Sequence, residues 1–214
     1  MTTILQTALD LTEGKRALQI AEEAVKGGTD WIEAGTPLVK SEGMNIIRSL
    51  KKAFPDKRIV ADLKTSDTGG LGVEMAAKAG ADIVCILASA DDAVIRDALR
   101  GAALYGVELM ADMMNVKDPA ARAKELAEMG VQIINAHVGI DQQMGGGENP
   151  LDLLGEIGKL GVKVAAAGGL TKETAAEAAE AGADIVIVGA SIIKSADAEK
   201  AAREIRTAID APGL

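Results

Sequence analysis

The sequence predicts an α/β protein in which eight strand–helix units close into a single (β/α)8 TIM barrel domain over residues 1–214. Two observations support this prediction. Short aliphatic runs alternate with longer amphipathic segments along the whole chain, which is typical of a parallel sheet covered by helices. A polar residue or a glycine also stands at the end of nearly every aliphatic run, and in a parallel barrel these positions meet at one mouth.

Eight aliphatic runs are expected to be strands. Four of them share a local pattern of a glycine, a short polar step and a β-branched run, as expected for a helix C-cap, a loop and a buried strand. These four segments are Gly27–Glu33, Gly80–Ile86, Gly130–Asn135 and Gly182–Val188. The other four strands are expected at Ile4–Leu9, Ile59–Leu63, Val107–Ala111 and Val162–Ala167.

The segments between the strands are expected to be helices, because Ala, Glu, Lys and Leu dominate them and apolar residues recur at steps of three and four. Their expected bounds are Gly14–Lys26, Glu42–Ala53, Gly69–Ala79, Asp91–Leu104, Asp118–Met129, Pro150–Leu160, Lys172–Ala181 and Ala196–Ile209. An open doubly wound sheet is the alternative fold, but the regular count of eight units favours closure. No linker or change in composition divides the chain.

Composition excludes several classes of function. The chain is 48% hydrophobic but only 1% aromatic, and its formal net charge is −9, so neither stacking rings nor a basic surface is available for nucleic acid. No stretch approaches the ~20 apolar residues that cross a bilayer, and the first ten residues do not resemble a secretory signal. The single cysteine cannot form an internal disulfide, which suits a reducing compartment. Together these features predict a cytoplasmic protein that binds neither nucleic acid nor membrane. An anionic substrate would need a local binding site.

The segment Ala61–Gly69 carries the densest chemistry, because Asp62, Lys64 and Asp67 place two carboxylates around an ammonium group. Alone, this spacing is also compatible with surface ion pairs on a loop. Glu33, however, ends the preceding strand. Glu33 and Asp62 are therefore predicted to offer oxygens to a divalent cation such as Mg²⁺, which proteins usually hold by one or two carboxylates together with water and substrate.

His137 is the only histidine of the chain and follows the sixth strand directly. A structural, hydrogen-bonded histidine is the alternative, but at a barrel mouth it is the best candidate for a general base near neutral pH. Asp10 and Asp112 also end strands and are candidates for substrate contacts, and Asp112 is placed to orient the histidine. Asp141 is a further candidate, or simply a loop cap.

Glycines end the last two strands, in Gly168–Gly169 and in Gly189 followed by Ala190. They let backbone N–H groups approach a ligand closely, and the loops after strands 7 and 8 of such barrels often bind phosphate. Tight turns alone are the other explanation of these glycines. We predict that Gly168, Gly169, Gly189 and Ala190 bind phosphate.

Taken together, these residues resemble the orotidine-monophosphate decarboxylase superfamily, whose hallmark is the Asp-x-Lys-x-x-Asp pattern after strand 3. Within it the chain is most similar to the family of 3-hexulose-6-phosphate synthases. The resemblance covers essentially the whole chain, with matching segments in order at Leu5–Asp10, Ile32–Gly43, Ala61–Gly69, Ala79–Ile95, His137–Gln143 and Ala167–Leu170. The sequence departs from the family at Ser66, Ala88 and Gly145–Gly147, which bear on substrate fit.

The resemblance implies a reversible, Mg²⁺-dependent aldol reaction that joins D-ribulose 5-phosphate and formaldehyde into D-arabino-3-hexulose 6-phosphate. Glu33 and Asp62 would hold the cation, His137 would remove the C1 proton, and Lys64 would stabilise the enediolate. It also implies a homodimer with shared active sites, in which Asp67 reaches into the partner's site.

Two other functions stay open. A 3-keto-L-gulonate-6-phosphate decarboxylase would share the barrel, metal and lysine, but that branch typically has Glu and Arg where this chain has Asp112 and Ile140. A non-catalytic barrel that binds sugar phosphates is the alternative from another class. Loss of a metal carboxylate, Lys64 or His137 would mark such a protein, and all of these are present.

Overall fold

A computed structural model of the chain describes residues 2–139 and 151–211, and within them eight parallel strands form a closed barrel. The strands pair in chain order, and β8 pairs with β1 to close the sheet. Their bounds are β1 Ile4–Leu9, β2 Trp31–Ala34, β3 Arg58–Thr65, β4 Ile83–Leu87, β5 Glu108–Asp112, β6 Ile133–His137, β7 Lys163–Ala167 and β8 Ile185–Val188. The predicted (β/α)8 barrel is therefore confirmed, and the open sheet is excluded.

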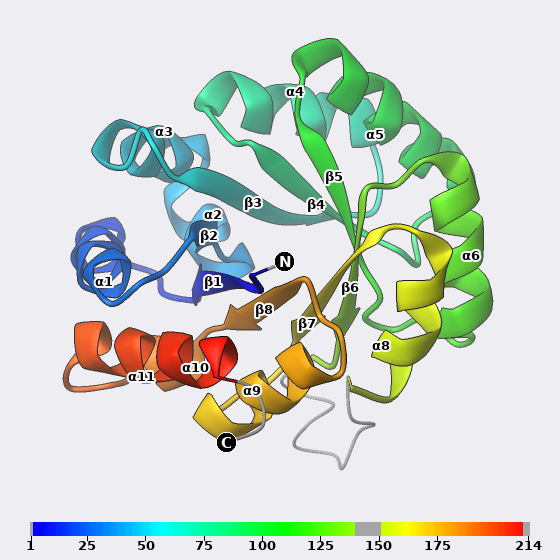
Figure 1. Cartoon of the computed structure of the whole chain (residues 1–214). Coiled ribbons are helices and arrows are strands. Elements are labelled where there is room, and N and C mark those ends of the chain that lie inside the picture. The colour runs from blue at the N-terminus through cyan, green and yellow to red at the C-terminus, as the bar shows by residue number, and fades with distance from the viewer. Residues whose placement is uncertain (1, 140–150, 212–214) are drawn as a thin grey trace.

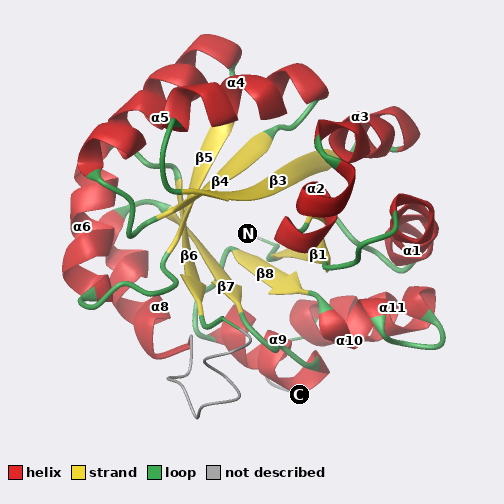
Figure 2. Cartoon of the chain, turned by 180° about the vertical axis from the view of Figure 1, so that it is seen from behind, coloured by secondary structure: helices red, strands yellow, loops and turns green. Residues whose placement is uncertain are grey.

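Helices surround the strands on every side, as Figure 1 and the opposite view in Figure 2 show. Their bounds are α1 Gly14–Lys26, α2 Thr36–Glu42, α3 Met44–Ala53, α4 Gly69–Ala79, α5 Asp92–Tyr105, α6 Pro119–Met129, α8 Leu151–Ile157, α9 Lys172–Glu180, α10 Ala190–Ile193 and α11 Ala198–Asp210, with a 3-10 turn at Gly158–Leu160. None of the helices in the described ranges is both long and apolar enough to span a bilayer.

Two hydrophobic layers follow from the alternation of side chains along each strand. One face of each strand packs against the helices in a large aliphatic core that includes Leu5, Ile32 and Leu109. The other face fills the barrel interior with residues such as Val60, Cys85 and Ile133. Because these interior layers occupy the space inside the strands, polar side chains that end the strands are held at the mouth.

The structure corrects three details of the predicted elements. Helices α2 and α10 were not predicted, and Gly43, at φ 63°, separates α2 from α3. The third strand was expected to end near Asp62, but β3 continues to Thr65. It does so because a β-bulge shifts its register, so that Asp62 pairs with Cys85 and Thr65 pairs with the next residue of β4, Ile86.

Candidate active site

Lys64 lies inside this bulge and joins two strands that are not neighbours in the sheet. Its backbone has φ 45°, a left-handed conformation that a non-glycine residue adopts at a cost of about 1–3 kcal/mol. The ammonium group donates to Asp62 Oδ2 and to Asp112 Oδ2, each at 2.9 Å. Burial alone would lower the pKa of Lys64, but Asp62 and Asp112 outweigh it and raise the pKa above its ordinary value. Lys64 is therefore a fixed positive charge at the mouth.

Asp112 is the centre of the hydrogen-bonded cluster at this mouth. Its Oδ2 atom lies 2.8 Å from His137 Nδ1 and also accepts from Lys64, while Oδ1 accepts from the Met114 N–H at 3.0 Å. Burial would raise its pKa, but the contacts with His137 and Lys64 lower the pKa to about 2. Asp112 therefore stays ionised at neutral pH and orients the imidazole through Nδ1, one of the two roles that the sequence suggested for it.

Two further carboxylates, Glu33 and Asp10, lie near Lys64, but no cation among the described residues contacts them closely enough to offset their loss of hydration. Glu33 is only 6% exposed, and burial, followed by the charges of Asp62 and Asp10, raises its pKa well above the ordinary value. The pKa of Asp10 is also raised, first because neighbouring protein displaces water and then because Asp62 repels a second negative charge. The mouth therefore concentrates negative charge that a bound cation would neutralise.

The oxygens of Asp62 are used unequally. Oδ2 accepts from Thr36 Oγ1 at 2.7 Å as well as from Lys64, whereas Oδ1 is buried and has no hydrogen-bond partner among the described residues. Buried carboxylate oxygens without a partner are rare in native proteins, and an unseen ion is one recognised reason for them. The donor set of Glu33 and Asp62 thus fits a divalent cation.

The described residues do not form a complete metal site by themselves, since no group of three or more His, Cys, Asp or Glu side chains in them is arranged to hold an ion. Two carboxylates with the other positions left to water and substrate oxygens is an arrangement that suits Mg²⁺. The Mg²⁺ assignment stays a prediction.

The glycines after β7 and β8 lie at the same mouth. Gly168 and Gly169 have φ 116° and 64°, conformations that favour glycine, and Gly189 caps the short helix α10. Ser191 Oγ donates to the Leu170 carbonyl oxygen at 2.7 Å and so joins the two loops. The segments after β7 and β8 are therefore linked at this mouth. Phosphate binding by Gly168, Gly169, Gly189 and Ala190 stays a prediction.

Two predicted site residues are not placed in the cluster. Asp67 is exposed on the loop after β3, where its carboxylate accepts from the Thr68 N–H at 2.8 Å. Asp141 and the Gly145–Gly147 segment lie outside the described residues.

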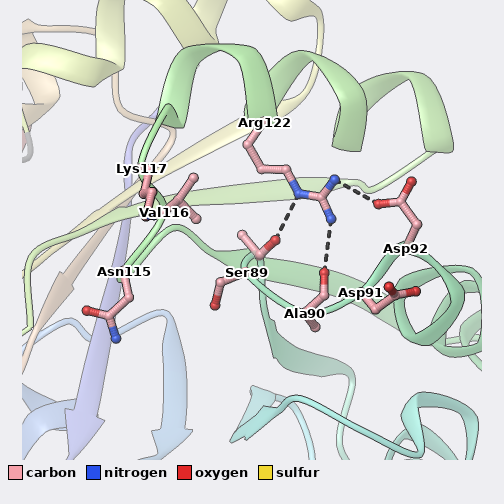
Figure 3. Close-up of a pocket in the computed structure, with 9 residues that line it drawn as sticks. Ser89, Ala90, Asp91, Asp92, Asn115, Val116, Lys117 and Arg122 are labelled. Atoms are coloured by element: carbon pink, nitrogen blue, oxygen red, sulfur yellow. Dashed lines mark hydrogen bonds and ion pairs between the residues drawn. The ribbon is translucent and has the colours of Figure 1, made fainter.

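A cavity of about 540 Å³ lies between the loops that follow β4 and β5, and none of the side chains of the cluster lines it. Figure 3 shows Arg122 of α6 reaching across it, where its guanidinium donates to the carbonyl oxygens of Ala88 (2.9 Å) and Ala90 (3.1 Å) and to Asp92 Oδ1 (2.8 Å). The Ala88 N–H in turn donates to the Asp112 carbonyl oxygen at 2.8 Å. Arg122 therefore braces the backbone next to Asp112.

Sequence reasoning missed three polar residues near the site, two on the interior face of the strands and one, Thr36, at the start of α2. Gln6 donates to Glu33, Thr36 donates to Asp62, and Asn135 is buried opposite Asp112 in the sheet register. Gln6 and Asn135 each lie inside an aliphatic strand, an even number of positions before Asp10 and His137. A polar residue on the same face as a strand-end candidate is the signal that could have found them.

A closed (β/α)8 barrel whose ionised side chains meet at the carboxyl ends of its strands has the architecture of a barrel enzyme. The chain belongs to the orotidine 5′-phosphate decarboxylase / HUMPS family, whose model matches residues 3–205. The resemblance predicted from the sequence is thereby confirmed.

Within this family, the chain is similar to proteins named 3-hexulose-6-phosphate synthase. The chain is 38% identical to 3-hexulose-6-phosphate synthase from Mycobacterium gastri, over 96% of this chain and 99% of that protein. It is 40% identical to 3-hexulose-6-phosphate synthase from Methylomonas aminofaciens, over 94% and 97% of the two chains. A crystal structure of 3-hexulose-6-phosphate synthase superposes with a TM-score of 0.91 at 37% identity, over 97% of this chain and 99% of that one.

Proposed function

We propose that this chain is a lyase that condenses D-ribulose 5-phosphate with formaldehyde to D-arabino-3-hexulose 6-phosphate, reversibly, in the cytoplasm. The names of its relatives support the reaction. The single observation that carries it is the hydrogen-bonded chain from Lys64 through Asp112 to His137, beside the carboxylates of Glu33 and Asp62. This arrangement combines a base, a fixed cation and a place for a second cation.

His137 acts as the base in this proposal. Asp112 is ionised and holds Nδ1, which favours the tautomer that carries its proton on Nδ1 and leaves the Nε2 lone pair to accept one. Nε2 takes a proton from C1 of the ketose, and the electron pair left on C1 is delocalised into an enediolate.

Lys64 stabilises the charge that develops on the enediolate oxygens. Its ammonium stays protonated because Asp62 and Asp112 flank it, so it can donate a hydrogen bond without prior rearrangement. A Mg²⁺ ion held by Glu33 and Asp62 would supply further positive charge against these oxygens. C1 then attacks the carbon of formaldehyde and the new C–C bond forms. The formaldehyde oxygen takes the proton held on His137 Nε2 and becomes the new hydroxyl group, which restores the base.

The glycine loops after β7 and β8 bind the phosphate of the substrate in this proposal. Backbone N–H groups provide the contacts there, which would let an anion bind despite the net charge of −9. We therefore expect phosphorylated pentoses to inhibit in the micromolar to millimolar range and dephosphorylated pentoses not to inhibit.

The protein also acts as a homodimer in this proposal, with Asp67 reaching into the partner's site. Asp67 is exposed, and the helix that follows its loop presents two apolar side chains to solvent, Leu71 at 55% and Met75 at 44% exposure. Both observations support a contact surface at α4.

The decisive experiment incubates the protein with ribulose 5-phosphate, formaldehyde and Mg²⁺ and looks for a six-carbon sugar phosphate. We expect product, loss of turnover in excess chelator, and recovery when Mg²⁺ is added back. A parallel reaction with 3-keto-gulonate 6-phosphate and CO₂ detection tests the decarboxylase alternative. Binding of the pentose phosphate without any turnover would favour a non-catalytic barrel, and full activity in chelator would remove the metal.

A further inference from the structure

Gln6 is a fully buried polar side chain that contacts the proposed cation site. It lies on β1 with 0% exposure, and its Nε2 atom donates to Glu33 Oε2 at a short 2.6 Å. Glu33 is itself 6% exposed and lies on the neighbouring strand β2. The amide nitrogen can only donate, and it faces a carboxylate oxygen that accepts.

Fold stability does not explain a glutamine at this position. Its Oε1 atom is buried and has no hydrogen-bond partner in the described ranges, and an unsatisfied buried acceptor is unfavourable for folding. An unbranched apolar side chain of similar size, such as methionine, would fill the same space without that penalty. What glutamine adds is the single contact with Glu33.

The hydrogen bond from Gln6 also engages one of the two oxygens of the Glu33 carboxylate. With Oε2 held by Gln6, rotation of the carboxylate about its last bond is restricted, and the group faces the mouth in one orientation. Thr36 makes the equivalent contact with Asp62, where it occupies Oδ2 while Oδ1 keeps no partner among the described residues. Each proposed ligand thus has one oxygen engaged by a neutral donor.

We propose that Gln6 is a positioning residue that presets Glu33 for a divalent cation. This inference rests on the proposed function only in assuming that Glu33 binds a cation. Groups that orient metal ligands typically change metal affinity 10- to 100-fold when they are removed. The readout is therefore metal affinity, measured without catalysis.

The test compares Gln6→Met with Thr7→Val in the full chain, after treatment with chelator. Thr7 is the next residue of β1, is equally buried, and points to the other face of the strand, where its hydroxyl pairs with Thr29 Oγ1 at 2.7 Å. Thr7→Val thus removes a buried hydrogen bond from the same strand without touching Glu33. Mn²⁺ alone is titrated and followed by electron paramagnetic resonance, and thermal unfolding is measured without metal.

We expect opposite results for the two variants. Gln6→Met weakens Mn²⁺ binding by about tenfold or more, while its Tm stays within about 3 °C of the wild type or rises. Thr7→Val lowers Tm by about 2–8 °C and changes the Mn²⁺ affinity less than about twofold. Unchanged affinity in Gln6→Met, or an affinity loss that simply follows Tm in both variants, overturns the inference.

Gln6→Asn guards against a folding failure of the first variant, because it keeps the amide but withdraws it by one methylene group. It should weaken Mn²⁺ binding in the same direction. If the wild type binds Mn²⁺ but forms no hexulose phosphate, the proposed function fails and the role of Gln6 stands. If the wild type binds no Mn²⁺, the role of Gln6 is overturned.

Discussion

The two ends of the barrel both carry charged clusters, but they balance charge in opposite ways. At the amino ends of the strands, Glu108 pairs with Arg58 at 2.8 Å and with Lys163 at 3.1 Å. Both cations also lie over the Trp31 ring, at 4.8 and 6.0 Å from its centroid. Burial would raise the pKa of Glu108, but the two cations lower it, so its negative charge is compensated.

At the carboxyl ends, the described residues place the carboxylates of Asp10, Glu33, Asp62 and Asp112 around the ammonium group of Lys64. Asp112 and Asp62 contact Lys64. Glu33 has a raised pKa because it is buried and lies near like charges, and the pKa of Asp10 is raised because it is partly desolvated and lies near Asp62. The comparison shows that acidic side chains stabilise the fold where cations pair with them. Where carboxylates outnumber the cations around them, they leave negative charge that a bound cation can neutralise. This difference fits the usual division of a (β/α)8 barrel, in which the amino ends of the strands serve stability and the carboxyl ends carry the active site. Unfavourable interactions at an active site lower the stability of the fold.

The largest expected effect is a loss of activity when a residue at the carboxyl ends of the strands is changed. We expect His137→Ala to lower turnover about 10³-fold, equivalent to about 4 kcal/mol in the barrier, because the base is lost. Exchange of the ketose C1 proton with solvent, followed by NMR, measures this step directly. His137→Asn retains a donor for Asp112 and should be equally inactive. Normal exchange in either variant would exclude His137 as the base.

The converse change at the amino end should reduce stability and spare activity. Trp31 is 6% exposed, and Trp31→Ala removes its packing and both cation contacts, so we expect a loss of about 3 kcal/mol in the free energy of unfolding. Urea unfolding measures this, with Trp31→Phe as the control that keeps a ring. A large fall in kcat of the folded variant would show that the two ends are not independent.

Acid should weaken the ion pairs that Asp112 makes at the mouth. The pKa of Asp112 is about 2 in the folded protein against 3.8 ordinarily, so its stabilisation is complete above pH 4 and is lost as the pH falls towards 2. The shift corresponds to about 2 kcal/mol. The difference in unfolding free energy between wild type and Asp112→Asn should therefore shrink over this range. A constant difference would contradict the ion pairing.

The smallest expected effect is a gain in stability when a carboxylate at the mouth is replaced. The raised pKa of Glu33 means that its ionisation opposes folding, and this destabilisation grows as the pH rises above 4.5. Glu33→Gln should raise the unfolding free energy of the metal-free protein by about 1 kcal/mol at pH 8, and less at pH 5. Chemical unfolding at both values tests this. A less stable variant at pH 8 would place Glu33 among the stabilising charges.

Local pattern was enough to find the barrel and most candidate site residues. Aliphatic periodicity located the strands within a few residues, and the polar strand ends Glu33, Asp62 and His137 are apparent without coordinates. The bulge in β3 and the short helix α2 were missed, because both depend on backbone conformations at Lys64 and Gly43 that neighbouring residues do not specify. Gln6 was missed because it resembles an ordinary interruption of an aliphatic strand.

The sequence by itself determined which residues face inward, since side-chain alternation and helical periodicity are local properties of the chain. Only the tertiary structure decided which of them touch. Lys64 and Asp112 are 48 positions apart and lie on strands separated by β4, yet their side chains meet at 2.9 Å. That contact depends on barrel closure, strand stagger and a bulge, which arise from the packing of the whole sheet and cannot be read from either segment alone.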